Sequence, residues 1–280
     1  MIDIHSHLLP GVDEGPKSWE ESLRLCRALV DDGITTAVAT PHVIDRVYPN
    51  TTTRVRAFVG ELNERLAAAA VPLTVLPGGE IQVSCRHLTE PPFDSLPTLA
   101  GHRYLLLELP AAFVPPSIEN LLFSLLARGV FPVIAHPERC IAVQTDLRLA
   151  HRWRRAGAVL QVDAESLLGL FGDATARAAR GLVLAGLAHA LASDSHSCHR
   201  RPPRLTAAAA LVTRMAGPDV ARFLVEEGPA RLVAGRPAAD PPAPDASRRR
   251  QHPWTRWARG WPWRRRRHAS PTSSSLTSSR

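Results

Sequence analysis

Short runs of apolar residues alternate along the chain with longer stretches in which apolar residues recur at helical spacing. This alternation predicts parallel strands joined by crossover helices, which is the pattern of an α/β fold. We expect seven strands, over residues 2–5, 34–40, 72–78, 103–109, 131–136, 158–163 and 189–193.

Two of the intervening helices carry clear start and stop signals. Ser18, followed three residues later by Glu21, forms a capping box that satisfies amides at the start of a helix, and Gly33 ends that helix. A second helix is expected from Ile118 to Arg128. Both helices therefore have defined ends before the next predicted strand.

The chain changes character after about Arg236. Residues 237–280 are rich in Pro, Arg, Trp and Ser and have no periodicity, so they cannot bury enough apolar area to become ordered. We expect one domain over residues 1–236 and a disordered basic tail over residues 237–280. The tail holds ten arginines and two aspartates, which accounts for the whole formal charge of +8, so the body is balanced. Nucleic acid is therefore not expected as the main partner.

Tryptophan and arginine are interleaved between Trp254 and Arg267, as in segments that bind anionic membranes or single-stranded nucleic acid. We expect a solvated appendage without a defined task, with weak contact to an anionic membrane as the alternative. The start of the chain has no basic leader and no apolar signal core, and four cysteines are too few for a disulfide scaffold. These features predict a cytoplasmic location.

Histidines and acidic residues recur where the predicted strands end. In a parallel barrel all strands end on one face, so these side chains are expected to converge. The candidates are His5 and His7, His42, Glu80, Glu108, His136, and Asp194 with His196. Each is weak alone, because Glu108 could face water and His42 could be a loop residue. Six successive strand ends with such residues are much harder to explain structurally, because charged residues are rarely buried without partners.

The predicted cluster has the donor types of a metal site. His5 and His7 alternate along a strand, so both imidazoles can face one ion. Nitrogen and carboxylate ligands without thiolate suit zinc, manganese or iron better than calcium, and bridging carboxylates favour several ions.

Six motifs resemble the polymerase and histidinol phosphatase (PHP) superfamily, and most closely its manganese-dependent bacterial tyrosine-protein phosphatases of capsular and exopolysaccharide synthesis, the CpsB/CapC type. They are MIDIHSH at 1–7, GVDEGPKS at 11–18, ATPH at 39–42, GEI at 79–81, IAHPER at 134–139 and ASDSH at 192–196. The resemblance covers roughly residues 1–236. It implies a distorted seven-stranded (β/α)7 barrel, similar to a TIM barrel, with three metal ions at its mouth.

The resemblance also implies roles for individual residues. Manganese is the usual ion, although other divalent ions could replace it. The ligand positions match His5, His7, His42, Glu80, Glu108, His136, Asp194 and His196, and Arg139 and Arg201 match a pair that grips phosphate. Glu14 stands where the family has aspartate, so a longer side chain occupies a ligand position. A homo-oligomer contact near Trp19 is implied as an alternative to simple packing.

The expected activity is hydrolysis of phosphotyrosine by a metal-bound hydroxide, with no covalent intermediate on the protein. The resemblance implies a phosphotyrosine protein as partner, and a membrane-associated bacterial tyrosine kinase is the expected one. The short segments 94–103 and 110–117 leave little chain for a lid, which favours a protein substrate. The alternatives are a small-molecule phosphatase of the histidinol-phosphate type, and a metal-holding regulator or nucleic-acid binder whose catalysis has decayed.

One further motif suggests a different chemistry. Cys198 and Arg204 have the Cys-x5-Arg spacing of thiolate-dependent tyrosine phosphatases. Those enzymes bind phosphate with a cradle of backbone amides. Pro202 and Pro203 have no N–H group and the loop has no glycine, so we interpret this match as a coincidence.

Overall fold

The structure is a computed structural model that describes residues 1–89, 96–245 and 247. Its strands pair only in parallel and form two sheets, ordered β1-β2-β4 and β3-β5-β6-β7-β8-β9. The strands are β1 (Ile2–Ser6), β2 (Thr36–Ala39), β3 (His42–Val43), β4 (Thr74–Pro77), β5 (Glu80–Gln82), β6 (Tyr104–Glu108), β7 (Phe131–Ile134), β8 (Val159–Asp163) and β9 (Ala190–Ala192).

The two sheets form one curled wall. Only two residues separate β2 from β3, and only Gly78 and Gly79 separate β4 from β5. The first strand also approaches the last, because Ser6 bridges Ser195 in parallel and the His7 N–H donates to the Ser195 carbonyl at 2.8 Å. The predicted parallel α/β fold is confirmed. The predicted count of seven strands is not, because the described residues form nine.

Apolar side chains from six strands pack together on the concave side of this wall, where one face of each strand can meet the others. This inner core contains Ile4, Val38, Leu106, Val133, Val159 and Ala190, and Leu232 joins it from a helix near the C-terminal end of the fold. A larger core fills the space between the sheet and the helices. The strands are therefore buried on both faces, as expected for parallel sheets.

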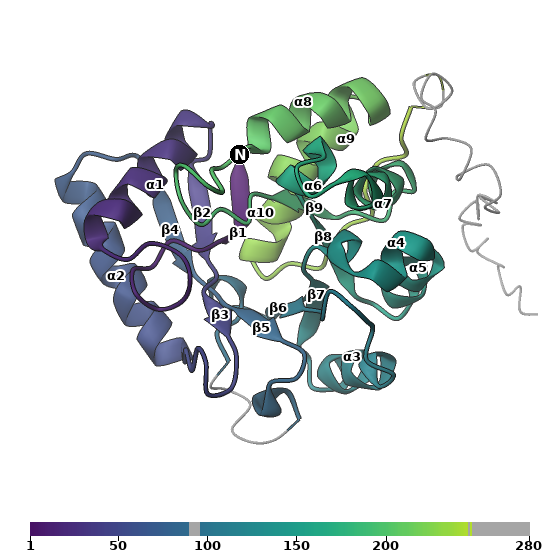
Figure 1. Cartoon of the computed structure of the whole chain (residues 1–280), viewed down its shortest axis with the longest axis horizontal. Helices are drawn as coiled ribbons and strands as arrows, with labels where there is room; N and C mark the ends of the chain where they lie inside the picture. The colour runs from purple at the N-terminus through teal and green to yellow at the C-terminus, as the bar shows by residue number, and fades with distance from the viewer. Residues whose placement is uncertain (90–95, 246, 248–280) are drawn as a thin grey trace, which may run out of the picture.

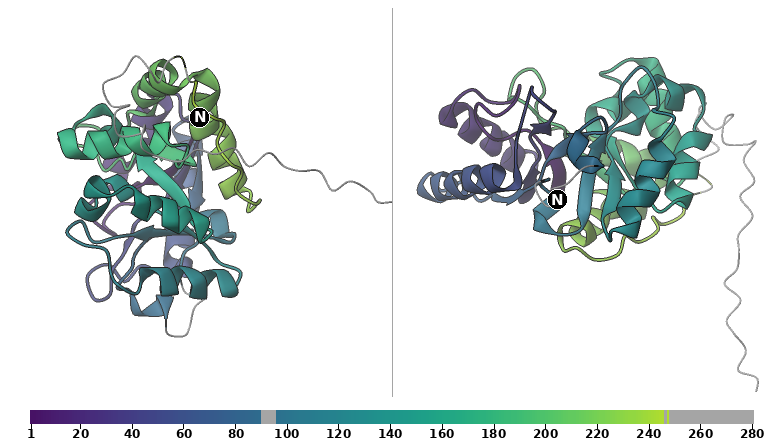
Figure 2. Two further views of the ribbon diagram at one scale, coloured as in Figure 1. Left: turned by 90° about the vertical axis from the view of Figure 1, so that its right-hand side faces the viewer. Right: turned by 90° about the horizontal axis from the view of Figure 1, so that it is seen from below.

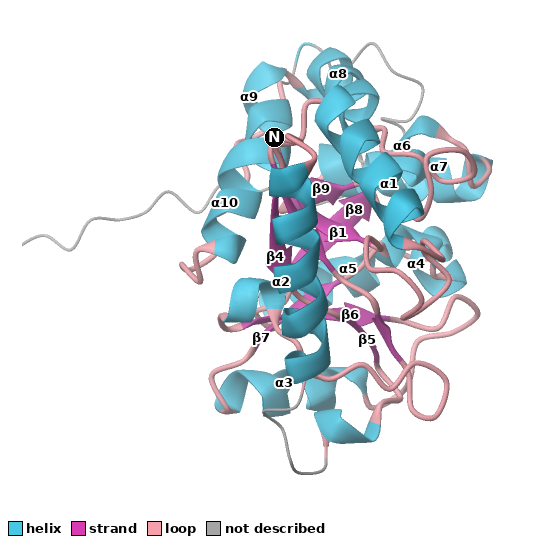
Figure 3. Cartoon of the chain, turned by 90° about the vertical axis from the view of Figure 1, so that its left-hand side faces the viewer, coloured by secondary structure: helices cyan, strands magenta, loops and turns pink. Residues whose placement is uncertain are grey.

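The helices lie around the outside of the curled sheet (Figure 1). They are α1 (Trp19–Asp31), α2 (Thr52–Ala68), α3 (Ile118–Ala127), α4 (Ile141–Thr145), α5 (Arg148–Arg155), α6 (Ala164–Leu168), α7 (Asp173–Leu184), α8 (Leu205–Ala216), α9 (Pro218–Arg222) and α10 (Gly228–Val233). Figure 2 gives two further views, and Figure 3 shows α1 and α2 side by side over one flank. In the described parts of the chain, no helix combines the length and apolar character needed to cross a membrane.

The predicted starts of both helices and the stop of the first at Gly33 are confirmed. The Ser18 hydroxyl accepts from the Glu21 N–H at 3.3 Å, and the Glu21 carboxylate accepts from the Lys17 N–H at 2.7 Å rather than from Ser18 itself. Gly33 follows α1 with φ of +83°, a conformation that glycine adopts without strain. The second predicted helix, α3, agrees with its expected start and ends one residue early.

Trp19 packs within its own chain at the start of α1. Its ring stacks on Phe58 of α2 at 5.9 Å between centroids, and the Arg65 guanidinium lies 4.6 Å from its centroid. The packing role expected for Trp19 is therefore confirmed, while the oligomer contact stays a prediction.

The first residues of the predicted tail lie along the body. The Pro237 carbonyl accepts from Arg231 Nε at 2.8 Å, Asp240 pairs with Arg154 at 2.5 Å, and the Asp245 N–H donates to the Ala216 carbonyl at 2.9 Å. These contacts connect the segment to α10, α5 and α8 in turn. The interleaved Trp and Arg positions of the tail lie outside the described residues.

A buried histidine should make the fold sensitive to acid. His189 precedes β9, and its Nδ1 accepts from the Leu160 N–H at 3.2 Å. Burial, followed by the nearby Arg154, lowers the pKa of His189 from 6.5 to about 4, while Asp240 acts in the opposite direction. Between these pH values the unfolded chain binds a proton that the folded chain does not, so stability falls as the pH is lowered from 6.5 to 4.

We expect His189 to account for about 3 kcal/mol of the decrease in unfolding free energy between pH 6.5 and pH 4. His189→Asn keeps an acceptor for Leu160 but cannot titrate in this range. Urea unfolding between pH 7 and pH 4 should therefore show a shallower loss of unfolding free energy in His189→Asn than in the unaltered protein. Parallel pH profiles for the two proteins would contradict the assignment.

Candidate active site

The side chains predicted from the sequence lie together at the carboxyl edge of the strands. Most of them are buried, namely His5, His7, His42, Glu80, His136, Asp194 and His196. The others are partly or largely exposed, namely Glu14, Glu108, Arg139 and Arg201. The site therefore has a buried floor and a more open rim.

Two histidines and two carboxylates form the centre of the floor. The Nε2 atoms of His5 and His7 lie 3.3 Å apart. Glu80 Oε2 is 3.2 Å from His5 Nε2 and 3.4 Å from His7 Nε2, and Asp194 Oδ1 is 3.4 Å from both nitrogens. One atom from each of these four residues lies within 4.8 Å of the others, which is the spacing of ligands around one metal ion.

A second group surrounds His42. His7, His42 and His196 each offer a nitrogen within the same mutual distance of 4.8 Å. Glu14 lies at the rim of this group, with Oε1 at 2.9 Å from His42 Nε2 and 3.4 Å from His196 Nε2. The longer side chain at position 14 therefore still reaches the cluster, although its carboxylate is 44% exposed.

A third group forms on the other side of His42, where Glu80 and Glu108 also converge. His42 Nδ1 lies 3.1 Å from Glu80 Oε2 and 3.7 Å from Glu108 Oε2. His136, two residues after β7, approaches Glu80 with Nε2 at 2.8 Å from Oε1. Glu80 therefore contacts side chains from several strand ends at once, as a bridging carboxylate would.

Neighbouring polar groups orient the histidines. Asp13 Oδ2 lies 2.7 Å from His7 Nδ1 and also accepts from the His42 N–H at 3.1 Å. Gln161 Oε1 lies 3.1 Å from His5 Nδ1 and 3.3 Å from the His136 amide nitrogen. These contacts occupy Nδ1 of His5 and His7 and direct each Nε2 towards the centre, which is how metal-bound histidines are usually held.

The backbone is distorted where these side chains originate. Asp3 of β1 pairs with Ala37 of β2, and Ser6 of β1 pairs with Ala39 of β2. Three residues along β1 therefore lie opposite two residues along β2, which is a β-bulge. Such a bulge redirects side chains. His136 and Asp194 have positive φ values of 26° and 48°, which are uncommon for residues other than glycine. Strain of this kind is maintained only where the surrounding structure fixes it.

Both predicted arginines meet at one carboxylate. Arg139 Nη1 donates to Asp194 Oδ2 at 2.7 Å, and Arg201 Nη2 donates to the same oxygen. Asp194 thus faces the histidines with Oδ1 and the arginines with Oδ2. The two guanidiniums are consequently held at the edge of the histidine cluster.

Burial and charge act against each other in the floor. Burial alone would raise the pKa of Glu80, but His5, His136 and His7 around it hold that pKa well below its usual range. Burial would lower the pKa of His5, but Glu80 and Asp194 raise it to about 9. The arrangement therefore favours positive charge between these side chains.

The donor set fits divalent metal ions. Imidazole nitrogens and carboxylate oxygens converge in three overlapping groups, with His7, His42 and Glu80 shared between groups. No thiolate takes part, so the groups suit manganese, zinc or iron. His136 and Glu14 contact the groups without belonging to one of them.

Sequence reasoning missed a buried acidic pair behind Arg139. Glu138 Oε1 accepts from the Asp163 N–H at 2.9 Å, and Asp163 Oδ2 lies 3.9 Å from Arg139 Nη1. Burial raises the pKa of Glu138 to about 7. Gln161 and Asp163 alternate on β8 within an otherwise apolar run, and this pattern could have marked both residues.

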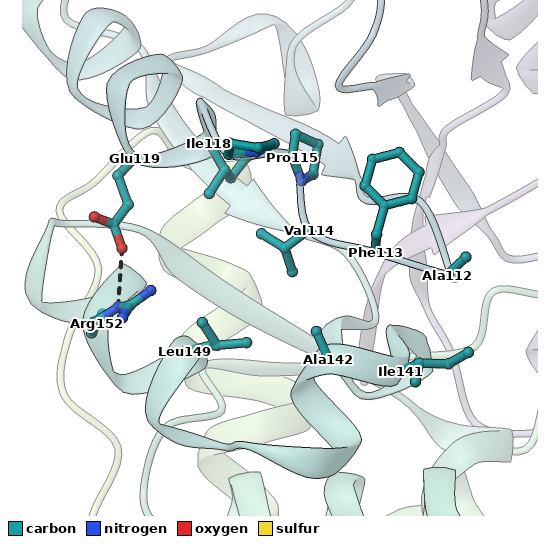
Figure 4. A pocket seen from close by; sticks show the side chains of 11 residues that line it. Ala112, Phe113, Val114, Pro115, Ile118, Glu119, Ile141, Ala142, Leu149 and Arg152 are labelled. Atoms are coloured by element: carbon teal, nitrogen blue, oxygen red, sulfur yellow. Dashed lines mark ion pairs between the residues drawn. The ribbon is translucent and has the colours of Figure 1, made fainter.

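Two hollows of similar volume differ in the residues that line them. One, of about 570 Å³, lies over His196 and Arg201 and is bordered by Glu14, Lys17 and Arg24. The other, of about 510 Å³, is lined mainly by apolar side chains such as Phe113 and Ile141, with Glu119 and Arg152 paired at 3.0 Å across one end (Figure 4). Of these two hollows, the first is lined by residues of the candidate site, namely Glu14, His196 and Arg201.

The Cys-x5-Arg motif does not form a phosphate cradle. The amides of Arg200 and Arg201 point to the Ser197 hydroxyl, at 2.9 and 3.4 Å. The Arg204 guanidinium pairs with Glu165 at 3.3 Å. These contacts agree with the interpretation of this motif as a coincidence.

Comparison with known proteins gives consistent matches. Residues 1–234 match the family described as "Capsular polysaccharide synthesis, CpsB/CapC". The tyrosine-protein phosphatase YwqE of Bacillus subtilis is 35% identical over 244 residues, which cover 87% of this chain and 96% of YwqE. The tyrosine-protein phosphatase CpsB of Streptococcus pneumoniae is 29% identical, over 83% of this chain and 98% of CpsB.

Solved structures agree. A chain from the crystal structures of YwqE and CpsB, described as unique metal-dependent tyrosine phosphatases, has a TM-score of 0.80 and 35% identity, covering 88% of this chain and 99% of that one. The phosphotriesterase homology protein of Escherichia coli, complexed with phosphate, has a TM-score of 0.55 at 13% identity, over 83% of this chain and 98% of that one. The second match concerns the fold alone.

The geometry predicts that divalent ions stabilise the fold. At a concentration of Mn²⁺ a hundred times its dissociation constant, binding to the folded state adds about 2.7 kcal/mol. We expect Mn²⁺ to raise the unfolding temperature of metal-free protein, measured by calorimetry. Glu80→Gln should reduce this shift, whereas Glu61→Gln, on the exposed side of α2, should retain it. Equal shifts in both variants would place the ions elsewhere.

Proposed function

We propose that this chain, which belongs to the capsular polysaccharide synthesis family CpsB/CapC, is a metal-dependent protein-tyrosine phosphatase. The observation that carries the proposal is the double contact of Asp194. One of its oxygens faces the histidine cluster, and the other holds Arg139 and Arg201. A phosphoryl group at this position would meet metal ligands on one side and two guanidiniums on the other.

The proposed ligands are His5, His7, Glu14, His42, Glu80, Glu108, His136, Asp194 and His196. The resemblance of their motifs supports three manganese ions, and the three overlapping donor groups are compatible with that number. Divalent ions, when bound, supply a Lewis acid that lowers the pKa of a water molecule towards neutrality. The protein contributes the fixed ligands and the groups that orient them.

The arginines bind the phosphoryl oxygens. Each guanidinium has five N–H donors in a planar fork. Asp194 accepts from one nitrogen of each arginine, and Nη1 of Arg201 also lies 3.1 Å from His196 Nε2, so only part of each fork is used. The remaining donors can bind phosphate and stabilise the charge that grows on its oxygens during hydrolysis. Asp194 keeps both forks in place while they do so.

A phenol is a suitable leaving group for this site. Its parent pKa is about 10, so departure of phenolate needs less help from a general acid than departure of a serine alkoxide. This difference supports phosphotyrosine as the substrate, in agreement with the activity for which YwqE and CpsB are named.

The family description supports a place in capsule or exopolysaccharide synthesis. We infer that the substrate is the phosphorylated tail of a membrane-associated bacterial tyrosine kinase, and that the phosphatase acts from the cytoplasm. The catalytic domain is residues 1–236, and residues 237–280 form an appendage to it.

We also infer that the sheet is a distorted seven-stranded barrel. We count β2 and β3 as one interrupted strand, and β4 and β5 as another. The nine strands of the described residues then occupy seven strand positions in the sheet. The bridge between Ser6 of β1 and Ser195, three residues after β9, supports closure of the ring.

An assay of metal-free protein reloaded with Mn²⁺, Zn²⁺ or Mg²⁺ tests the proposal. We expect Mn²⁺ to restore hydrolysis of a phosphotyrosine peptide with a kcat/KM well above that for histidinol phosphate or a phosphoserine peptide. A preference for histidinol phosphate would replace the proposal with a small-molecule phosphatase, and no hydrolysis of any of the three would remove it.

The two arginines should contribute strongly to that rate. Arg139→Ala and Arg201→Ala each remove donors to the transition state, and we expect each to lower kcat/KM by about 10²–10³. Arg222→Ala, on the exposed surface of α9, serves as the matched control and should leave the rate unchanged. Similar rates for all three variants would exclude the arginines from phosphate binding.

Cysteine chemistry gives the opposite expectation. Cys198→Ser should keep most of the phosphatase activity, because the described loop forms no amide cradle around this thiol. The measurement is kcat/KM on the phosphotyrosine peptide in the presence of Mn²⁺. Loss of activity in this variant would favour a thiolate mechanism instead.

A further inference from the structure

Phe171 is an aromatic residue at the candidate active site, and the proposed function gives it no role. It lies between α6 and α7, in a turn bounded by Gly169 and Gly172, which have φ values of +96° and +89°. The Leu170 N–H donates to the Glu165 carbonyl at 3.0 Å and the Gly172 N–H to the Gly169 carbonyl at 3.2 Å. These bonds fix the turn that presents the ring.

The ring contacts both phosphate-binding arginines. The guanidinium carbon of Arg139 lies 4.8 Å from the ring centroid, and that of Arg201 lies 5.8 Å from it. Both distances are within the range of cation–π attraction. The two arginines follow different strands, β7 and β9, so this one side chain connects groups that are far apart in the sequence.

Phe171 does not behave as an ordinary core residue. It is half-buried, and among the described residues it belongs to neither apolar core nor to the side chains packed against them. Its neighbours at the mouth are instead the two guanidiniums. The side chain is partly exposed, and the guanidiniums beside it are the two that bind the phosphoryl group in the proposed function.

An aromatic ring suits this position for a physical reason. Arg139 and Arg201 carry like charges and converge on one oxygen of Asp194. The negative face of a phenyl ring attracts both cations without offering an acceptor that competes with phosphate for their N–H groups. A second carboxylate here would hold the arginines more strongly but would repel the substrate.

The same ring can recognise the leaving group. A phosphoryl group bound by both arginines lies beside Phe171, and the aromatic ring attached to that phosphoryl group then comes within reach of the accessible part of the side chain. Offset or edge-to-face contact between two aromatic rings adds to the area they bury. An alkyl group at the same place gains no such contact.

We propose that Phe171 is a positioning and specificity-determining residue, which holds Arg139 and Arg201 in place and packs against the aromatic ring of phosphotyrosine. The proposal rests on the proposed phosphatase function, since it assumes that the two arginines bind the phosphoryl group. It assigns to this chain a preference for aryl over alkyl phosphates.

Binding of phosphonates tests the proposal without turnover. Calorimetry on the full chain loaded with Mn²⁺ would compare phenylphosphonate, methylphosphonate and inorganic phosphate. Phe171→Leu removes the ring but keeps an apolar side chain, Phe171→Tyr restores the ring, and Phe123→Leu is the matched control. Phe123 is an exposed phenylalanine on α3.

We expect Phe171→Leu to lower the preference for phenylphosphonate over methylphosphonate about fivefold, and to weaken phosphate binding by a similar factor. Phe171→Tyr and Phe123→Leu should stay within about twofold of the unaltered protein on both measures. The unfolding temperature of each variant separates loss of binding from loss of folding. Phe171→Tyr, which restores the ring, serves as the second variant in this comparison.

Two results would overturn the proposal in different ways. If Phe171→Leu keeps both the aryl preference and the affinity for phosphate, the ring has neither role, and the phosphatase function still stands. If the unaltered protein binds none of the three ligands, the phosphate site itself is wrong and the proposed function fails with it.

Discussion

Two carboxylates, Glu80 and Asp194, are buried where the strands end, and the rest of the site is arranged to neutralise them. A buried carboxylate without partners is unfavourable by several kcal/mol, so its surroundings must supply positive charge or donors. Glu80 obtains these from His5, His42 and His136, and Asp194 obtains them from Arg139 and Arg201. The same need is met when divalent cations bind, which explains why a metal centre and a pair of arginines can share one carboxylate.

The fold maintains this arrangement by local distortion and by support from a second layer. The bulge in β1 and the positive φ values of His136 and Asp194 set the directions of three central side chains. Asp13 and Gln161 then fix the imidazole rings. Except for Glu14, the proposed ligands lie on a strand or within four residues of the end of one, so the framework that forms the core also sets the distances within the site.

The sequence was most informative where one rule governs many residues. Parallel strands end on one face, so histidines and carboxylates at strand ends could be expected to converge, and the structure brings them together. The strand count was less predictable, because the breaks between β2 and β3 and between β4 and β5 depend on local geometry. At position 78, for example, a Cβ would lie 2.6 Å from Val38 Cγ1. The roles of Gln161, Asp163 and Phe171 depend on partners from other elements, so only the alternation on β8 could have indicated the first two.

The contacts between the first strand and the end of the last strand determine when, during synthesis of the chain, the active site can form. Asp3 of β1 accepts from the Ser193 N–H, a contact between residues separated by 190 positions. Ribosomes release chains from the N-terminus onwards, and contacts this distant form late. A nascent polypeptide that carries His5 and His7 therefore lacks Asp194 and Arg201 until well past half of its length has been made, although Arg139 is made near the midpoint. Incomplete translation products that end before Asp194 can hold part of the centre but lack Arg201, so they cannot assemble the phosphate-binding pair.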